Sequence, residues 1–175
     1  MTPGRIRNGI DLDALEAFVR GREKAPDLTV RTEWIGGAQS VATISRDALA
    51  APSASTFVVH VDESSACLGN GTGPAPAELA AVALSAAFAQ AFVIAASRDN
   101  VTIDALSVNV GRSAPPGATA PPRWRIECTV DSDAAPPQLR AFTRAAIASE
   151  LVRSLAMRAP SVSIVRAHDK ERDMT

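Results

Sequence analysis

The sequence predicts an α+β fold, because runs of antiparallel strands are separated by single long helices. Residues 123–133 alternate between apolar and polar side chains, as a half-buried strand does. Two long helices are predicted, at residues about 77–97 and about 136–157, because both ranges are rich in residues that favour helices. We find no internal repeat and no break in composition, so residues 1–175 are expected to form one domain.

The N-terminal third predicts one short helix and three strands. Residues about 11–23 place four apolar side chains on one helical face. These side chains are Leu12, Leu15, Phe18 and Val19. Residues 28–35 and 38–45 alternate around the Gly-Gly pair at 36–37 and predict a β-hairpin, and residues 56–61 predict a third strand.

The stretch at 79–96 contains only two polar residues, Ser85 and Gln90. Its length reaches that of a membrane span, but half of it is alanine, which contributes little to transfer into lipid. Pro76 and Glu78 are typical of a helix start, because proline needs no donor there and a carboxylate suits the positive end of the dipole. We therefore expect a helix buried on all sides by protein, not a membrane span.

The C-terminal half continues with a strand at 101–111, a Pro-rich connection at 112–122 and the strand at 123–133. The second long helix follows, and a last strand is predicted at 161–167.

Composition excludes several classes of function. The net charge is −1 and charged residues make up 21%, so nothing favours binding to nucleic acid or to an anionic membrane. The N-terminus lacks the apolar core of a signal peptide, which predicts a cytoplasmic protein whose Cys67 and Cys128 are reduced thiols. The two histidines, His60 and His168, have no metal-ligand spacing, so we expect no metal.

Two further motifs have ordinary explanations. The glycines of "GNGTGP" (69–74) meet neither the P-loop nor the dinucleotide fingerprint, so turn geometry explains them and no cofactor is expected. His60 beside Asp62 and Glu63 is a conceivable acid–base group, but an exposed face of a sheet is the commoner explanation.

Three segments resemble the OsmC/Ohr family. They are "WIGGAQSVATIS", "VDESSACLGNGTGPAPAELAAVALSAAFAQAF" and "DSDAAPPQLRAFTRAAIASELVRSLAMRAPSVSI". The resemblance extends from about Asp11 to Ala167, and its order of segments agrees with the elements predicted above. It implies an intertwined homodimer in which two long central helices are wrapped by sheets from both subunits. Such a dimer would explain why the helix at 77–97 is apolar all round.

The resemblance also implies an activity, the thiol-dependent reduction of organic hydroperoxides. A reactive cysteine on the central helix attacks the peroxide and a second cysteine on the later helix resolves the sulfenic acid. The two cysteine positions correspond to Ala87 and Glu150. The family's glutamate corresponds to Ala77, with Glu78 beside it, and the family's arginine to Ala38. The residues present predict that the peroxidase activity is lost.

Three side chains retain chemical interest. Glu150 either faces the former active-site cavity, where desolvation would raise its pKa and suit acid–base catalysis, or points to solvent and pairs with Arg153 or Arg144. Cys67 is either a relocated nucleophile or, as we favour, a small apolar plug in its loop. Cys128 lies on the apolar face of a strand and is expected in the core.

The expected pocket is apolar. The residues that would line it, unless they are ordinary core, belong to the central helix, its start and the first hairpin. They are Leu84, Ala87, Phe88, Ala77, Glu78, Ala38 and Trp34. We therefore predict a protein that binds and transforms a small apolar molecule at the dimer interface without a thiol, in a setting such as specialised metabolism. The alternatives are a non-catalytic carrier, a pseudo-enzyme subunit paired with a related OsmC-like protein, and a hydroperoxide reductase that uses Cys67.

Overall fold

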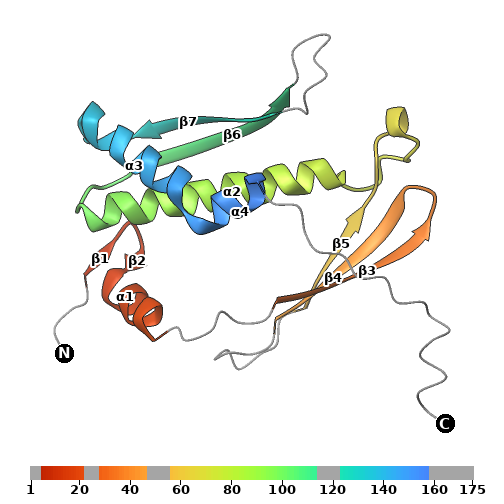
Figure 1. Cartoon of the computed structure of the whole chain (residues 1–175), viewed down its shortest axis with the longest axis horizontal. Helices are drawn as coiled ribbons and strands as arrows, with labels where there is room; N and C mark the ends of the chain where they lie inside the picture. Colours follow the sequence, from red (N-terminus) through yellow and green to blue (C-terminus); the bar gives the residue numbers. More distant parts are fainter. Residues whose placement is uncertain (1–4, 22–27, 47–55, 114–122, 158–175) are drawn as a thin grey trace.

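The computed structural model describes residues 5–21, 28–46, 56–113 and 123–157, and these form an α+β fold built around one long helix (Figure 1). This helix, α2 (Pro76–Arg98), confirms the predicted central helix and supplies half of the buried core. Its buried apolar side chains are Leu84, Ala87, Phe88, Phe92 and Ala96.

The start of α2 follows the predicted chemistry. Pro76 occupies the first turn, where no backbone donor is needed. The Glu78 carboxylate accepts a hydrogen bond from the backbone N–H of Ala75 at 2.8 Å, which satisfies one backbone donor at the helix start. By length and composition α2 resembles a membrane span, but the core helices of soluble proteins share these properties, so this is weak evidence for a membrane protein.

One face of α2 is covered by a two-stranded antiparallel sheet of β6 (Ala105–Ser113) and β7 (Arg123–Asp131). The side chains that pack on the core are the alternating apolar ones of both strands. They are Leu106, Val108, Val110, Trp124, Ile126, Cys128 and Val130. The first strand begins four residues later than predicted, because the backbone N–H of Val101 still bonds to Ala96 at the end of α2.

The predicted helix at 136–157 is two helices, α3 (Pro136–Ala148) and α4 (Glu150–Met157). Ser149 separates them with an extended backbone (ψ 143°), and its carbonyl accepts the N–H of Arg153, so it acts as the N-cap of α4. The break lets both helices bury apolar side chains against α2, Phe142 from α3 and Val152 from α4. Helical periodicity alone therefore gave a helix that was too long.

The N-terminus contains a hairpin that we did not predict. Strands β1 (Ile6–Arg7) and β2 (Ile10–Asp11) are joined by Asn8 and Gly9, whose φ angles are 51° and 74°. Positive φ at both positions is what a type I′ turn requires, and Asn-Gly is its preferred sequence. The predicted first helix follows as α1 (Leu12–Arg20), capped by the Asp11 carboxylate.

The remaining strands form a separate antiparallel sheet, β3 (Leu28–Gly36), β4 (Gln39–Arg46) and β5 (Thr56–Val61), in the order β3-β4-β5. This confirms the predicted hairpin and third strand. The sheet extends away from the layer of helices, beyond the N-terminal end of α2 (Figure 1). We call it the arm.

The two faces of the arm differ in polarity. The strand register places Val30 opposite Ile44 and Ile44 opposite Phe57, so apolar side chains share one face. The other face carries the ion pair between Arg31 and Glu33, at 2.6 Å. On the apolar face Trp34 is 75% exposed and Phe57 46% exposed. The described residues of the chain therefore leave this face uncovered. The predicted strand at 161–167 and most of the Pro-rich connection lie outside the described residues.

Candidate functional site

Ala87, to which we assigned the position of the family's reactive cysteine, lies in the core. Ala87, Leu84 and Phe88 are 5%, 2% and 2% exposed and pack in one cluster with Phe92, Phe142 and other buried residues. The ring of Phe92 meets that of Phe142 edge to face at 5.8 Å. In the chain itself these three predicted pocket residues are therefore packed side chains and do not line an open groove.

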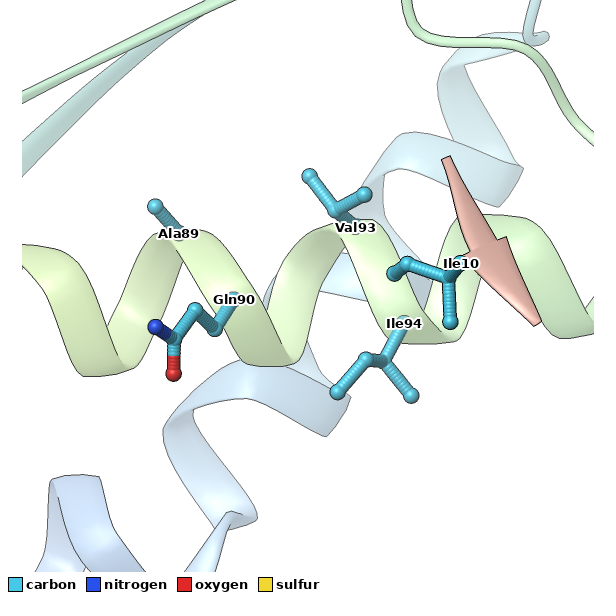
Figure 2. Close-up of a pocket in the computed structure, with 5 residues that line it drawn as sticks. All are labelled: Ile10, Ala89, Gln90, Val93 and Ile94. Atoms are coloured by element: carbon cyan, nitrogen blue, oxygen red, sulfur yellow. The ribbon is translucent and has the colours of Figure 1, made fainter. Parts of the chain in front are cut away.

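An apolar groove lies on the opposite side of α2. Its lining is Ile10 of β2 together with Ala89, Gln90, Val93 and Ile94 of α2, and its volume is about 320 Å³ (Figure 2). Among these five residues only Gln90 offers hydrogen-bonding groups, and its side chain is exposed. A few polar atoms on an apolar wall are typical of small-molecule sites. Sequence reasoning noted Gln90 as an exception within an apolar run but did not assign it to a pocket.

The other predicted pocket residues lie elsewhere. Ala77 and Glu78 are exposed in the first turn of α2, and the Glu78 carboxylate accepts the N–H of Ala75. Ala38 is half-buried in the turn between β3 and β4. Trp34 is exposed on the arm, and its indole N–H donates to the carbonyl oxygen of Gly37 at 2.9 Å. In a single chain these side chains do not gather around the groove.

Glu150 is exposed in the first turn of α4, the helix that packs against α2. Among the described residues no ion pair joins its carboxylate to Arg153 or Arg144. The side chain therefore neither lies in an enclosed cavity of this chain nor makes the predicted ion pairs.

The two cysteines differ in surroundings. Cys67 is exposed at the end of a short 3₁₀ helix (Ser65–Cys67) in the loop before α2. Cys128 is half-buried on the inner face of β7, where burial raises the pKa of its thiol. Both are free thiols.

Asp62 is a buried polar centre that sequence reasoning undervalued. It is 1% exposed, and its Oδ2 atom accepts hydrogen bonds from Thr72 N–H at 3.0 Å, Thr72 Oγ1 at 2.8 Å, Asn70 N–H at 3.1 Å and Gln39 Nε2 at 3.3 Å. The bond from the Thr72 backbone lowers the pKa of Asp62 most, burial opposes it, and the remaining bonds help to bring the value to about 2. The sequence did offer a signal for this role, because an aspartate just before a glycine-rich loop often accepts hydrogen bonds from nearby backbone amides.

The glycines of this loop have structural reasons. A Cβ atom at Gly69 would overlap the carbonyl group of Glu63, and one at Gly73 would overlap that of His60. Gly71 has a φ of 67°, a conformation that glycine adopts at little cost. The loop is therefore closely packed around Asp62, and His60 itself is exposed on β5.

Comparisons with known proteins agree with this architecture. A family model described as "OsmC-like protein" matches residues 69–164. A protein from Psychrobacter arcticus, named for osmotic stress and detoxification response, superposes with a TM-score of 0.58 at 16% identity, over 75% of this chain and 90% of that one. An OsmC-like protein from Mycoplasma pneumoniae gives 0.54 at 16% identity, over 76% and 88%. An OsmC-like protein of unknown function from Vibrio cholerae gives 0.52 at 14%, over 74% and 94%.

No curated protein sequence matches the chain. At these identities the structural likenesses show the fold, while the family model covers more than half of the sequence. The chain belongs to the OsmC-like protein family.

Proposed function

We propose that this OsmC-like protein is a cytoplasmic homodimer that binds a small, largely apolar molecule in the groove along α2 and does not act as a thiol peroxidase. The observation that carries the proposal is the groove itself. It is apolar, has a volume of about 320 Å³, and offers one amide side chain, that of Gln90, for a directed hydrogen bond.

Two uncovered apolar surfaces support the homodimer. The outer side of α2 exposes Val82 at 62%, and the apolar face of the arm exposes Trp34 and Phe57. Water-soluble proteins seldom leave surfaces of this kind open, and an arm that lies on a second copy would remove both from water. Because the groove lies on this outer side of α2, the second copy would turn it into an enclosed pocket.

The surroundings of the thiols support chemistry other than peroxide reduction. Alanine stands at position 87, within the core. The thiol of Cys128 is half-buried and its pKa is raised, so the reactive thiolate is disfavoured there. The exposure of Cys67 favours the alternative of a hydroperoxide reductase. That alternative predicts rapid hydroperoxide consumption that Cys67→Ser abolishes; equal slow consumption by a cysteine-free variant would exclude it.

Glu150 is our candidate acid–base residue if bound ligand is also transformed, because its carboxylate is exposed in the first turn of α4 and is open to contact with a second copy. The expected result for Glu150→Gln is lost turnover with ligand binding retained. Unchanged turnover would remove Glu150 from the mechanism. Absence of turnover in the unaltered protein would leave a carrier as the function.

The first experiment is native mass spectrometry of the protein purified gently from its own source. A dimer with a discrete small-molecule adduct is the expected result. Val93→Phe, which fills the groove, should remove the adduct and keep the dimer, and Asn109→Phe on the exposed outer face of β6 is the matched control. An adduct retained at the same stoichiometry in Val93→Phe would place the ligand elsewhere. A mixed complex with a related OsmC-like chain would favour the pseudo-enzyme alternative.

A further inference from the structure

Within the described residues, one corner of the arm makes side-chain hydrogen bonds to the loop that leads into α2. Strand β5 runs directly into the loop at 62–75, and the turn between β3 and β4 lies beside the same loop. Within the described residues, the side-chain hydrogen bonds from this hairpin to the loop are both made by Gln39. Its amide nitrogen donates to Asp62 Oδ2 at 3.3 Å and to Thr72 Oγ1 at 3.1 Å.

The loop side of this contact is densely hydrogen-bonded and closely packed. Asp62 Oδ2 collects the bonds from Asn70 and Thr72, and the N–H of Asp62 donates to the Pro74 carbonyl at 3.2 Å. Gly69 lies too close to the backbone of Glu63 for any side chain to fit. The loop therefore behaves as one closely packed unit around a single carboxylate oxygen.

This unit leads directly into α2. Pro74 is followed by Ala75, the N-cap of α2, whose N–H is held by the Glu78 carboxylate at 2.8 Å. A side chain that hydrogen-bonds to Asp62 is therefore attached to the segment that begins α2.

The second carboxylate oxygen, Asp62 Oδ1, is buried and has no hydrogen-bond partner among the described residues. A buried oxygen without a partner reduces stability. The four bonds to Oδ2 favour the ionised carboxylate, and they define a direction for each donor. The arrangement favours positioning over maximal stability.

We propose that the contact of Gln39 with Asp62 and Thr72 is a latch that fixes the direction of the arm relative to α2. The contact links the β3–β4 hairpin of the arm to the helix that carries the groove. Its consequence for assembly rests on the proposed homodimer, because an arm that covers a second copy binds more tightly when it already has the required direction.

The latch is tested by spin labels at Glu33→Cys on the arm and Arg98→Cys at the end of α2, both exposed, in a full-length chain with Cys67→Ser and Cys128→Ala. Dilution into a large excess of unlabelled chain restricts the measurement to distances within one subunit. A narrow distance distribution is expected. Gln39→Ala should broaden it, while Thr43→Ala on the same strand should leave it narrow.

The assembly is measured on the same variants by analytical ultracentrifugation. A hydrogen bond to a charged group that is lost with Gln39→Ala should weaken the dimer about tenfold. Unchanged distance distribution and unchanged dissociation constant in Gln39→Ala would overturn the latch. A monomeric wild type would instead contradict the proposed homodimer, and the distance distribution would still decide the latch. Gln39→Ala is used instead of a variant of Asp62 because it leaves the bonds from Asn70 and Thr72 to Asp62 intact.

Discussion

Asn8 is predicted to be a main stabilising residue of the N-terminal hairpin, although it lies in a surface turn. Its Nδ2 atom donates to Ser97 Oγ at 2.9 Å and to the Val101 carbonyl at 3.0 Å, and its Oδ1 accepts the N–H of Ile103 at 2.9 Å. These bonds join the hairpin to the end of α2 and the connection that follows it. Replacing Asn8 by alanine should therefore loosen a contact between segments about 90 residues apart.

The magnitude follows from the bonds and the backbone. Three hydrogen bonds at about 1 kcal/mol each give about 3 kcal/mol. The φ of 51° at Asn8 adds about 1 kcal/mol for alanine, and water that replaces part of the lost bonds offsets about as much. We expect Asn8→Ala to lower the free energy of unfolding by about 3 kcal/mol, or the Tm by roughly 6–12 °C for a chain of this size.

The assay is urea unfolding followed by circular dichroism at one fixed protein concentration, because assembly would make stability depend on concentration. Asn8→Gly relieves the backbone strain and should lose only the bonds. Asn109→Ala, on the exposed outer face of β6, should change stability by no more than about 0.5 kcal/mol. A loss below about 1 kcal/mol for Asn8→Ala would refute the role assigned to these bonds.

Three further outcomes are expected. Gly69→Ala should destabilise the protein by more than about 2 kcal/mol in urea unfolding, because its methyl group meets the Glu63 backbone. The pKa of Asp62 in the folded protein is about 2, below the ordinary 3.8, so its contribution to stability is fully present above pH 3.8 and is lost as the pH falls toward 2. In acid unfolding, Asp62→Asn should lack this pH-dependent loss of stability. Maleimide should label Cys67 well before Cys128, because Cys67 is exposed and burial raises the pKa of the Cys128 thiol.

The first two of these have a matched control within the chain, and in the third the two cysteines are compared with each other. Gly111→Ala introduces the same methyl group into open space at ordinary backbone angles and should be nearly neutral. Asp99→Asn removes an exposed carboxylate and should leave the acid transition unchanged. Equal stability of Gly69→Ala and Gly111→Ala would contradict the close packing at Gly69. An acid transition that is the same in Asp62→Asn and the wild type would contradict the role of Asp62, and equal labelling of both thiols would contradict the difference in their burial.

Local pattern was sufficient for most of the elements. The alternation at 123–133 predicted β7, and the proline, glutamate and continuous apolar residues around 76–98 predicted α2, because these features depend on nearby residues only. The family could also be recognised from its segments. The Asn-Gly hairpin at residues 8 and 9 was equally readable, since Asn-Gly is the preferred sequence of its turn type, but we did not predict it.

Contacts between distant segments decided the rest. Ser149 divides the second long helix, and the break lets α3 and α4 each pack an apolar side chain against α2. The periodicity of the sequence within the helix carries no information about this packing. Position 87 became core and the groove formed on the other side of α2, because the sheet of β6 and β7 covers only one face of that helix. The sequence alone determined that α2 is apolar on every side; which side is packed by its own chain and which is left open was decided by tertiary structure, since burial depends on the neighbours that the fold brings to each face.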